Sequence, residues 1–180
     1  VGGLNKSLYQ DCENRDRLEY GLPYGQDELI RALAQVNKNM TVVIISGNAV
    51  AMPWIDDVPS VLLGWYGGSE AGRAIADVLF GDVDASGRLP ISFPRSVGHI
   101  PCYYNHKVSA RGYYKKRGSK ENPGRDYVFE TPDALFGFGH GLSYTTFEYS
   151  DLTVSSKELE ENGQLKVSVR VRNTGSRTGK

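Results

Sequence analysis

A cluster of charged residues near the start of the chain could supply acid–base chemistry. The stretch Gln10–Arg17 holds three carboxylates and two guanidiniums and has no apolar periodicity. A carboxyl group whose pKa is raised toward neutrality by burial can act as a general acid, and a neighbouring arginine can hold a carboxylate such as Asp16 by paired hydrogen bonds. If a strand precedes it, this segment lies where open α/β sheets bind ligands. The alternative is a solvated network of ion pairs.

The segment Gly67–Gly72 suggests a different chemistry. It places Ser69 between an apolar run and an amphipathic stretch, the setting of a nucleophile elbow, where a serine on a tight turn is presented above a sheet. Ala71 stands where the G-x-S-x-G pattern has its last glycine, and the base would be one of three histidines, His99, His106 and His140. The alternative is that Ser69 only caps a helix.

Between Pro101 and Asp133 apolar periodicity stops, and basic residues are interleaved with tyrosines. Such a pattern can stack nucleic-acid bases, but the chain has 21 basic and 21 acidic residues and lacks the basic excess of a nucleic-acid-binding domain. Long irregular loops in compact domains are often functional, so a ligand-facing role stays open beside that of a solvated connection.

The elements that must position these segments alternate between strand and helix. A helix is expected from Gly25 to Asn37, with acidic residues in its first turn and one apolar stripe made of Leu29, Ile30, Leu33 and Val36. The uninterrupted β-branched run Thr41–Ser46 is typical of a parallel strand that is covered on both faces.

The same alternation continues along the chain. Val61–Trp65 predicts a second strand. A helix capped by Ser69 is expected to follow and to end before Gly81, with a buried stripe of Ile75, Val78 and Leu79.

Two further strands complete the expected sheet. Arg88–Phe93 predicts a strand, and Val1–Gly3 has the character of a strand tail whose beginning lies upstream. Strands that alternate with helices predict a mostly parallel sheet flanked by helices, an α/β sandwich of which this chain holds a part.

The pattern changes after Phe147. From Leu165 to Val171 apolar and polar residues alternate with period two, which predicts a half-buried antiparallel strand. Asp151–Ser155 is its expected partner. Because two strands do not make an independently stable sheet, we interpret this region as the opening of a truncated β-sandwich.

Composition excludes several classes of protein. The 180 residues carry no net charge and 39% of them are hydrophobic, which argues against intrinsic disorder. No apolar run approaches the roughly 18 residues of a membrane helix, and no signal peptide is visible. The length suits one domain with part of another.

Six stretches occur in a set order: Leu22–Ile30, Val43–Trp54, Trp65–Gly72, Ala76–Asp82, Ser86–Pro90 and Phe138–Phe147. In this order they resemble the C-terminal part of glycoside hydrolase family 3, the β-glucosidases and β-xylosidases. Each motif alone is weak, but six in sequence, spread over nearly the whole chain, make the resemblance specific.

The resemblance implies an architecture. Members of the family have an N-terminal (β/α)8 barrel, an α/β sandwich and often a fibronectin type III-like module. It implies that residues 1–147 are an α/β sandwich domain without its N-terminal part and that residues 148–180 begin a fibronectin III-like domain. The missing barrel is then the partner of this chain. No cofactor, metal, nucleic acid or membrane is expected, and a periplasmic or secreted parent enzyme is favoured over a cytoplasmic one.

The resemblance also implies a mechanism. The family hydrolyses β-glycosides with retention, using one carboxylate as nucleophile and another as acid/base. In the family the nucleophile is an Asp on the barrel, here upstream of Val1, and the acid/base is a Glu on a sandwich-domain loop. Glu13, followed by Asp16-Arg17 and Leu22-Pro23, fits the family's pattern, although Asn14 stands where many members have Gly. The expected substrates are terminal β-D-glucosides or xylosides, and the isolated chain is expected to be inactive.

Two other functions stay open. A non-catalytic module would bind carbohydrate, or dock to another domain, through the loop Pro101–Asp133 and would need no barrel. A serine hydrolase would use Ser69 and would cleave esters as the isolated chain.

Overall fold

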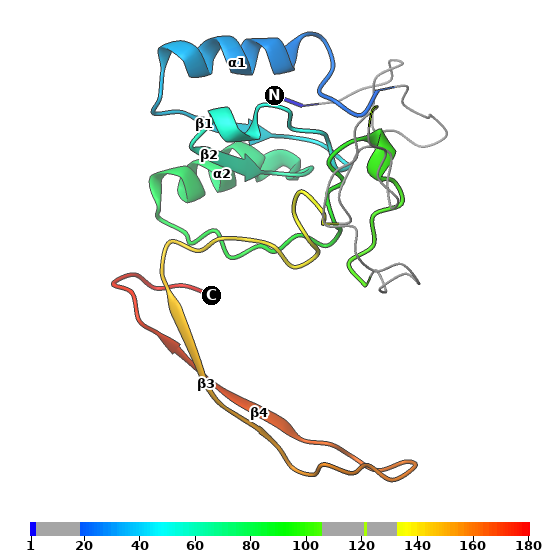
Figure 1. Cartoon of the computed structure of the whole chain (residues 1–180). Helices are drawn as coiled ribbons and strands as arrows, with labels where there is room; N and C mark the ends of the chain where they lie inside the picture. The colour runs from blue at the N-terminus through cyan, green and yellow to red at the C-terminus, as the bar shows by residue number, and fades with distance from the viewer. Residues whose placement is uncertain (3–18, 106–120, 122–132) are drawn as a thin grey trace. The chain divides into compact units, whose positions relative to one another are not determined.

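The structure, a computed structural model, describes residues 1–2, 19–105, 121 and 133–180 (Figure 1). It comprises two compact units, each built from two stretches of chain. The first unit is Val1–Ile75 with Arg88–His140, and the second is Ala76–Gly87 with Gly141–Lys180. The helices are α1 (Gln26–Val36) and α2 (Ala71–Phe80), with short 3-10 turns η1 (Ile55–Asp57), η2 (Gly68–Glu70) and η3 (Val97–His99). The strands are β1 (Thr41–Ile44), β2 (Ser60–Leu63), β3 (Phe147–Val154) and β4 (Val167–Asn173).

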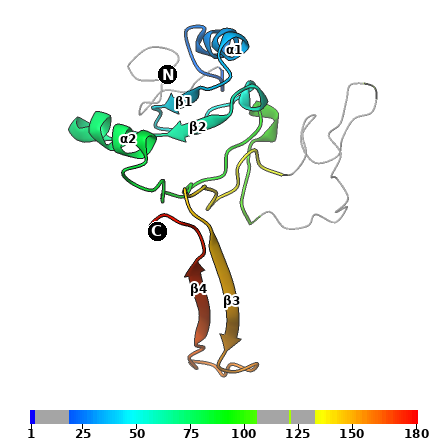
Figure 2. The ribbon, with the colours of Figure 1, turned by 90° about the vertical axis from the view of Figure 1, so that its left-hand side faces the viewer.

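The sheet of the first unit is parallel, as the sequence predicts. β1 and β2 pair in register from Thr41 opposite Ser60, and Figure 2 shows the two strands side by side. Gly2 forms a parallel bridge with Ile45 on the other side of β1. Three chain segments therefore run in the same direction, with β1 in the middle.

The core of the first unit lies between this sheet, α1 and the loop that follows β1. Its fully buried side chains include Trp54, Phe93, Ile30, Ile44 and Val50. α1 has the predicted extent, but of its expected apolar stripe only Ile30 is buried. Ile30 and Ala34, four residues apart on one helical face, are buried, whereas Leu29, Leu33 and Val36 are 52%, 45% and 82% exposed.

The helix expected after Ser69 is present, but it begins later. Ser69 lies inside η2 and does not cap the helix, because α2 starts at Ala71. The predicted end is confirmed, since Gly81 follows Phe80 with a φ of 81°, a conformation that glycine adopts without steric cost. Of the expected stripe, Ile75 and Val78 are half-buried and Leu79 is exposed.

The predicted strand Arg88–Phe93 is wrong as a regular strand. Phe93 forms only an isolated antiparallel bridge with Phe136, and Leu89 exchanges hydrogen bonds with the backbone of Gly139 and His140. Pro90 lies between these two points, and its missing N–H prevents a continuous ladder.

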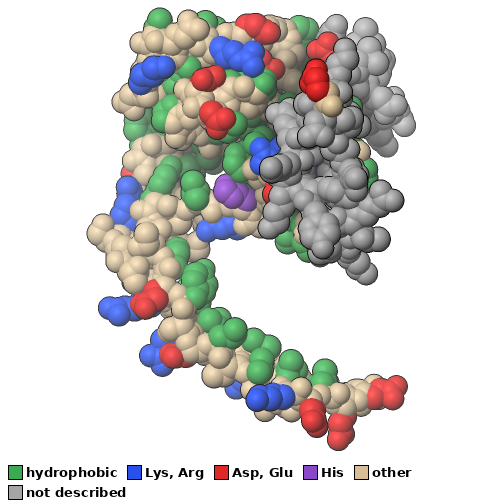
Figure 3. Space-filling view, viewed as in Figure 1, with side chains coloured by type: hydrophobic (Ala, Val, Ile, Leu, Met, Phe, Trp, Pro, Cys, Tyr) green, Lys and Arg blue, Asp and Glu red, His purple; other side chains and the backbone are tan. Residues whose placement is uncertain are grey.

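The second unit contains the antiparallel ribbon of β3 and β4, which confirms the alternating strand predicted near its end. The register shifts between Ser150 and Thr153, where Asp151 has a φ of 53° and pairs with Arg170 at 3.0 Å. The predicted half-burial is wrong in this structure. Apolar side chains gather along the ribbon (Figure 3), but no residue of β4 is buried, and its three valines, Val167, Val169 and Val171, are all exposed.

No helix among the described residues is long and apolar enough to span a membrane. Nor do the His, Cys, Asp and Glu side chains in this part of the chain gather into a group that could hold a metal ion.

Candidate functional site

The three parallel segments of the first unit end at the same edge of the sheet. Residues 3–18 follow Gly2, a buried loop follows β1, and the turn 64–68 follows β2. Ligands of open α/β sheets bind outside the carboxyl ends of the strands. This edge is therefore the candidate active site on the first unit.

The predicted acid/base lies outside the described residues. Glu13, with Asp16 and Arg17, falls in the stretch 3–18. The residues on either side of that stretch are described, and both ends are held by α1.

Gln26, the first residue of α1, binds the backbone of Gly2, the residue that precedes the stretch. Its Oε1 accepts a 2.7 Å hydrogen bond from the N–H of Gly2, and its Nε2 donates one of 2.9 Å to the carbonyl of Gly2. The same Nε2 also donates to the carbonyl of Pro23 at 2.9 Å. One side-chain amide thus satisfies both polar groups of the Gly2 backbone.

Asp27, the next residue, binds the backbone of Leu22, four residues beyond the stretch. Its Oδ2 accepts a 3.3 Å hydrogen bond from the N–H of Leu22, and its Oδ1 accepts one of 2.5 Å from the indole Nε1 of Trp54. Trp54 is fully buried and belongs to the core. Asp27 therefore links the backbone of Leu22 to the buried indole of Trp54.

The loops after β1 and β2 fill the rest of the edge with packed side chains. Ser46, fully buried, donates to the carbonyl of Asn48 at 2.8 Å and accepts from its N–H at 3.3 Å. Trp65 has a φ of 49° and meets Phe93 edge to face, with ring centroids 6.2 Å apart. The ring of Tyr66 lies where a side chain at Gly47 would be. The described residues of this edge therefore contact one another and the core through Phe93.

Among the described residues, no hydrogen bond joins Ser69 to His99 or His140. Ser69 is exposed in η2, whereas the Nδ1 of His99 accepts from the backbone N–H of Arg95 at 3.2 Å. The ring of His140 stacks on Phe136 at 4.8 Å, and His106 lies outside the described residues. The positive φ that an elbow places at its serine is found instead at Gly68, with a φ of 68°, where glycine adopts it without strain.

Of the basic and aromatic loop Pro101–Asp133, the structure describes residues 101–105, 121 and 133. Tyr103 and Tyr104 are exposed, and the Tyr104 ring contacts that of Phe138 with centroids 4.9 Å apart. Burial raises the pKa of the Cys102 thiol, although the nearby Arg95 guanidinium acts to lower it. This thiol is therefore a poor nucleophile at neutral pH.

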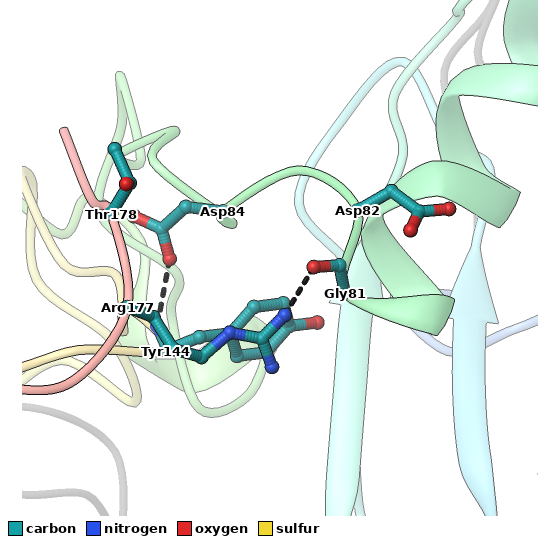
Figure 4. A pocket seen from close by; sticks show the side chains of 6 residues that line it. All are labelled: Gly81, Asp82, Asp84, Tyr144, Arg177 and Thr178. Carbon is teal, nitrogen blue, oxygen red and sulfur yellow. Dashed lines mark hydrogen bonds between the residues drawn. The ribbon is translucent and has the colours of Figure 1, made fainter.

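The second unit has a polar cavity of about 250 Å³ (Figure 4). Its lining consists of Gly81, Asp82, Asp84, Tyr144, Arg177 and Thr178. The carboxylate of Asp84 accepts from the Ser143 hydroxyl at 2.8 and 2.9 Å and from the N–H of Tyr144 at 2.7 Å. The Arg177 guanidinium donates to the carbonyl of Gly81 and lies 5.6 Å from the centre of the Tyr144 ring. The charged groups of the cavity thus bind the backbone of Gly81 and Tyr144, and we assign them a structural role.

Sequence reasoning missed Gln26 and Asp27. It assigned the acidic first turn of this helix to the helix dipole alone. The partners of the two side chains, Gly2 and Trp54, lie 24 and 27 residues away, and the only signal for them was that both fall inside one of the six motifs, Leu22–Ile30.

Comparison with known proteins identifies the family of this chain. Residues 1–144 match the profile of the glycosyl hydrolase family 3 C-terminal domain. Beta-glucosidase BoGH3A of Bacteroides ovatus is 48% identical over 183 residues, which cover 100% of this chain and 24% of the relative. The periplasmic beta-glucosidase of Salmonella typhimurium is 44% identical over 180 residues, 99% of this chain and 23% of the relative.

Solved structures agree with this assignment. DesR, a beta-glucosidase from Streptomyces venezuelae crystallised with D-glucose, superposes with a TM-score of 0.71 at 37% identity over 93% of this chain and 21% of that one. The chain thus spans about a quarter of the length of these relatives. The resemblance read from the six motifs and the mixed α/β fold are confirmed. This chain belongs to glycosyl hydrolase family 3, and residues 1–144 are its C-terminal domain.

Proposed function

We propose that this chain is part of a retaining β-glucosidase and supplies its acid/base, Glu13. The nucleophile is an Asp on an N-terminal barrel that precedes Val1 in the full-length enzyme, and the substrates are terminal β-D-glucosides. The isolated chain holds one of the two required carboxyl groups and is inactive.

The observation that carries this proposal is the match to β-glucosidases along the whole chain, at 44–48% identity. The topology supports the placement of the acid/base. The stretch that contains Glu13 begins just after Gly2, at the carboxyl edge of the parallel sheet, where such folds bind their ligands.

The chemistry follows from the two carboxyl groups. Glu13, protonated, donates its proton to the glycosidic oxygen while the barrel Asp displaces the leaving alcohol and forms the glycosyl-enzyme. The ionised Glu13 then takes a proton from water as the water attacks the sugar and releases the nucleophile. Acid assistance matters most for poor leaving groups, because activated aryl alcohols depart without a proton.

The test is Glu13→Gln in the full-length enzyme, with kcat/KM measured for methyl and for 2,4-dinitrophenyl β-glucoside. The variant should lose about 100-fold or more on the methyl glucoside and little on the activated one. Glu19→Gln, at an exposed glutamate just beyond the stretch, is the matched control and should change neither. An equal loss on both substrates would exclude Glu13 as the acid/base.

We also propose that the domain boundary falls at residue 147 and that residues 148–180 belong to a fibronectin III-like module. The support is the antiparallel β3–β4 ribbon, whose apolar side chains are exposed along β4. In a β-sandwich one face of this ribbon is covered by a second sheet.

This proposal is tested by thiol labelling. Val169→Cys in the full-length enzyme should resist a water-soluble maleimide, whereas the same substitution in this chain should react quickly. Ser168→Cys, on the opposite face of β4, should react in both. Equal labelling of both positions in the full-length enzyme would overturn the proposal.

A further inference from the structure

We propose that Gln26 and Asp27 are positioning residues for the acid/base of the enzyme. Gln26 binds Gly2, which precedes the stretch 3–18, and Asp27 binds Leu22, four residues beyond it, so their function is to fix the chain on either side of the stretch. The inference rests on the proposed function, because it takes the acid/base to lie in this stretch.

The geometry at Gly2 shows why a side chain is needed there. The bridge to β1 uses the polar groups of Val1, whose carbonyl accepts from the N–H of Ile45 at 2.9 Å and whose amino group donates to the carbonyl of Val43 at 3.0 Å. The N–H and carbonyl of Gly2 itself are the pair that Gln26 binds. The Gln26 amide thus pairs with Gly2 as a neighbouring strand would.

Gly2 has no side chain, so only hydrogen bonds to its backbone can hold it in place. A Cβ at this position would overlap the carbonyl oxygen of Ile45, so the residue has no side chain with which to anchor itself. The contact with β1 fixes one side of the backbone, and Gln26 fixes the other.

The other end of the stretch is held in a similar way. The N–H of Leu22 donates to Asp27, and the carbonyl of Tyr20 accepts from the N–H of Ala51 at 3.0 Å. Asp27 is itself fixed by the Trp54 indole.

Two successive residues in one turn of α1 therefore set the spacing between Gly2 and Leu22. A helix is stiff, so this spacing is defined far better than it would be by two independent loop contacts. A general acid must lie within hydrogen-bond reach of the departing oxygen, and a misplacement of about 1 Å can cost about 100-fold in rate.

The experiment uses the full-length enzyme with Gln26→Ala and, as matched control, Gln35→Ala, an exposed glutamine in the same helix. The readout is the ratio of kcat/KM for methyl β-glucoside to that for 2,4-dinitrophenyl β-glucoside. Gln26→Ala should lower this ratio about 10- to 100-fold, and Gln35→Ala should leave it unchanged. The ratio does not depend on the amount of folded enzyme, so a purely structural effect would lower both values equally and would overturn the inference.

A second variant keeps the test decisive if Gln26→Ala does not fold. In Asp27→Asn the amide oxygen still accepts from the buried indole of Trp54. The amide NH2 then faces the N–H of Leu22, and because both groups are donors, the hydrogen bond to Leu22 is lost. The same ratio should fall in this variant. If it stays at the value of the unmodified enzyme, Asp27 has no positioning role.

The Glu13→Gln variant separates this inference from the proposed function. A lowered ratio in Gln26→Ala with an unchanged one in Glu13→Gln would support positioning by Gln26 and assign the acid/base to a different residue of the stretch. A lowered ratio in Glu13→Gln alone would overturn the positioning role and leave the acid/base in place. Unchanged ratios in both would overturn both.

Discussion

The indole Nε1 of Trp54 donates a 2.5 Å hydrogen bond to Oδ1 of Asp27, so a fully buried aromatic side chain is satisfied by a carboxylate in the first turn of α1. This contact joins the helix to the loop after β1 across 27 residues of chain. It also orients the carboxylate whose second oxygen holds Leu22.

Asp27→Ala should therefore lower the free energy of unfolding by about 1–3 kcal/mol, because it leaves the Trp54 indole buried without an acceptor. Asp27→Asn should cost less, because it keeps an oxygen for the indole. Urea unfolding followed by tryptophan fluorescence measures both. Glu28→Ala, at the exposed neighbouring acid, should stay within about 0.5 kcal/mol of the unmodified chain. Equal losses in all three variants would show that the hydrogen bond to the indole contributes nothing.

Two glycines should respond in opposite directions to the same substitution. Gly2→Ala puts a methyl group into the carbonyl of Ile45 and should cost about 1–3 kcal/mol, the usual range for overpacking. Gly72→Ala lies in α2 with nothing within 4 Å of the new Cβ, and it should stabilise by about 0.5–1 kcal/mol. Thermal melts followed by circular dichroism would compare them, and a rise in melting temperature for Gly2→Ala would contradict the observed bridge.

Phe93 should be among the most sensitive core positions of the first unit. It is 1% exposed and meets Trp65 and Phe136 edge to face, so Phe93→Ala should cost about 3–5 kcal/mol. The control is Phe80→Ala at the end of α2, where the ring is 84% exposed and its loss should change stability by less than about 0.5 kcal/mol. Urea midpoints decide between them, and similar losses at both positions would refute this assignment of the core.

Two aspartates line the cavity of the second unit, and substituting them should change stability by different amounts. Asp84→Ala removes the acceptor of the Ser143 hydroxyl and of the Tyr144 N–H, and it should lower stability by about 1.5–3 kcal/mol. Asp82→Ala changes an exposed carboxylate on the same cavity and should have little effect. Hydrogen exchange at the Tyr144 amide would report the loss directly, with faster exchange expected only in the Asp84 variant.

Local patterns in the sequence predict most elements of the first unit. The extent of α1 follows from the 3.6-residue period, and β1 falls within the β-branched run Thr41–Ser46. The apolar run Val61–Trp65 predicts the presence of β2 but not its bounds, which are Ser60–Leu63. The buried face of α1 did not follow, because apolar residues occur on more than one side of the helix and Ala34 has too little apolar surface to stand out.

The elements that the sequence could not predict depend on distant partners. Phe93 pairs with Phe136 more than forty residues away, and Pro90 prevents the intervening strand from forming, although its neighbours have strand character. For the candidate site, the charge pattern of Gln10–Arg17 and the family motifs single out Glu13. The contacts that hold its stretch run from Gln26 to Gly2 and from Asp27 to Leu22, and no local pattern encodes them.

The discontinuous make-up of the second unit has a consequence for synthesis. Asp84 leaves the ribosome about sixty residues before Ser143 and Tyr144, the groups that it binds. At the usual 5–20 residues per second, this separation corresponds to a delay of about 3–12 s. During that time the stretch Ala76–Gly87 has none of its partners from Gly141–Lys180, so the second unit can fold only after the rest of the chain has been made.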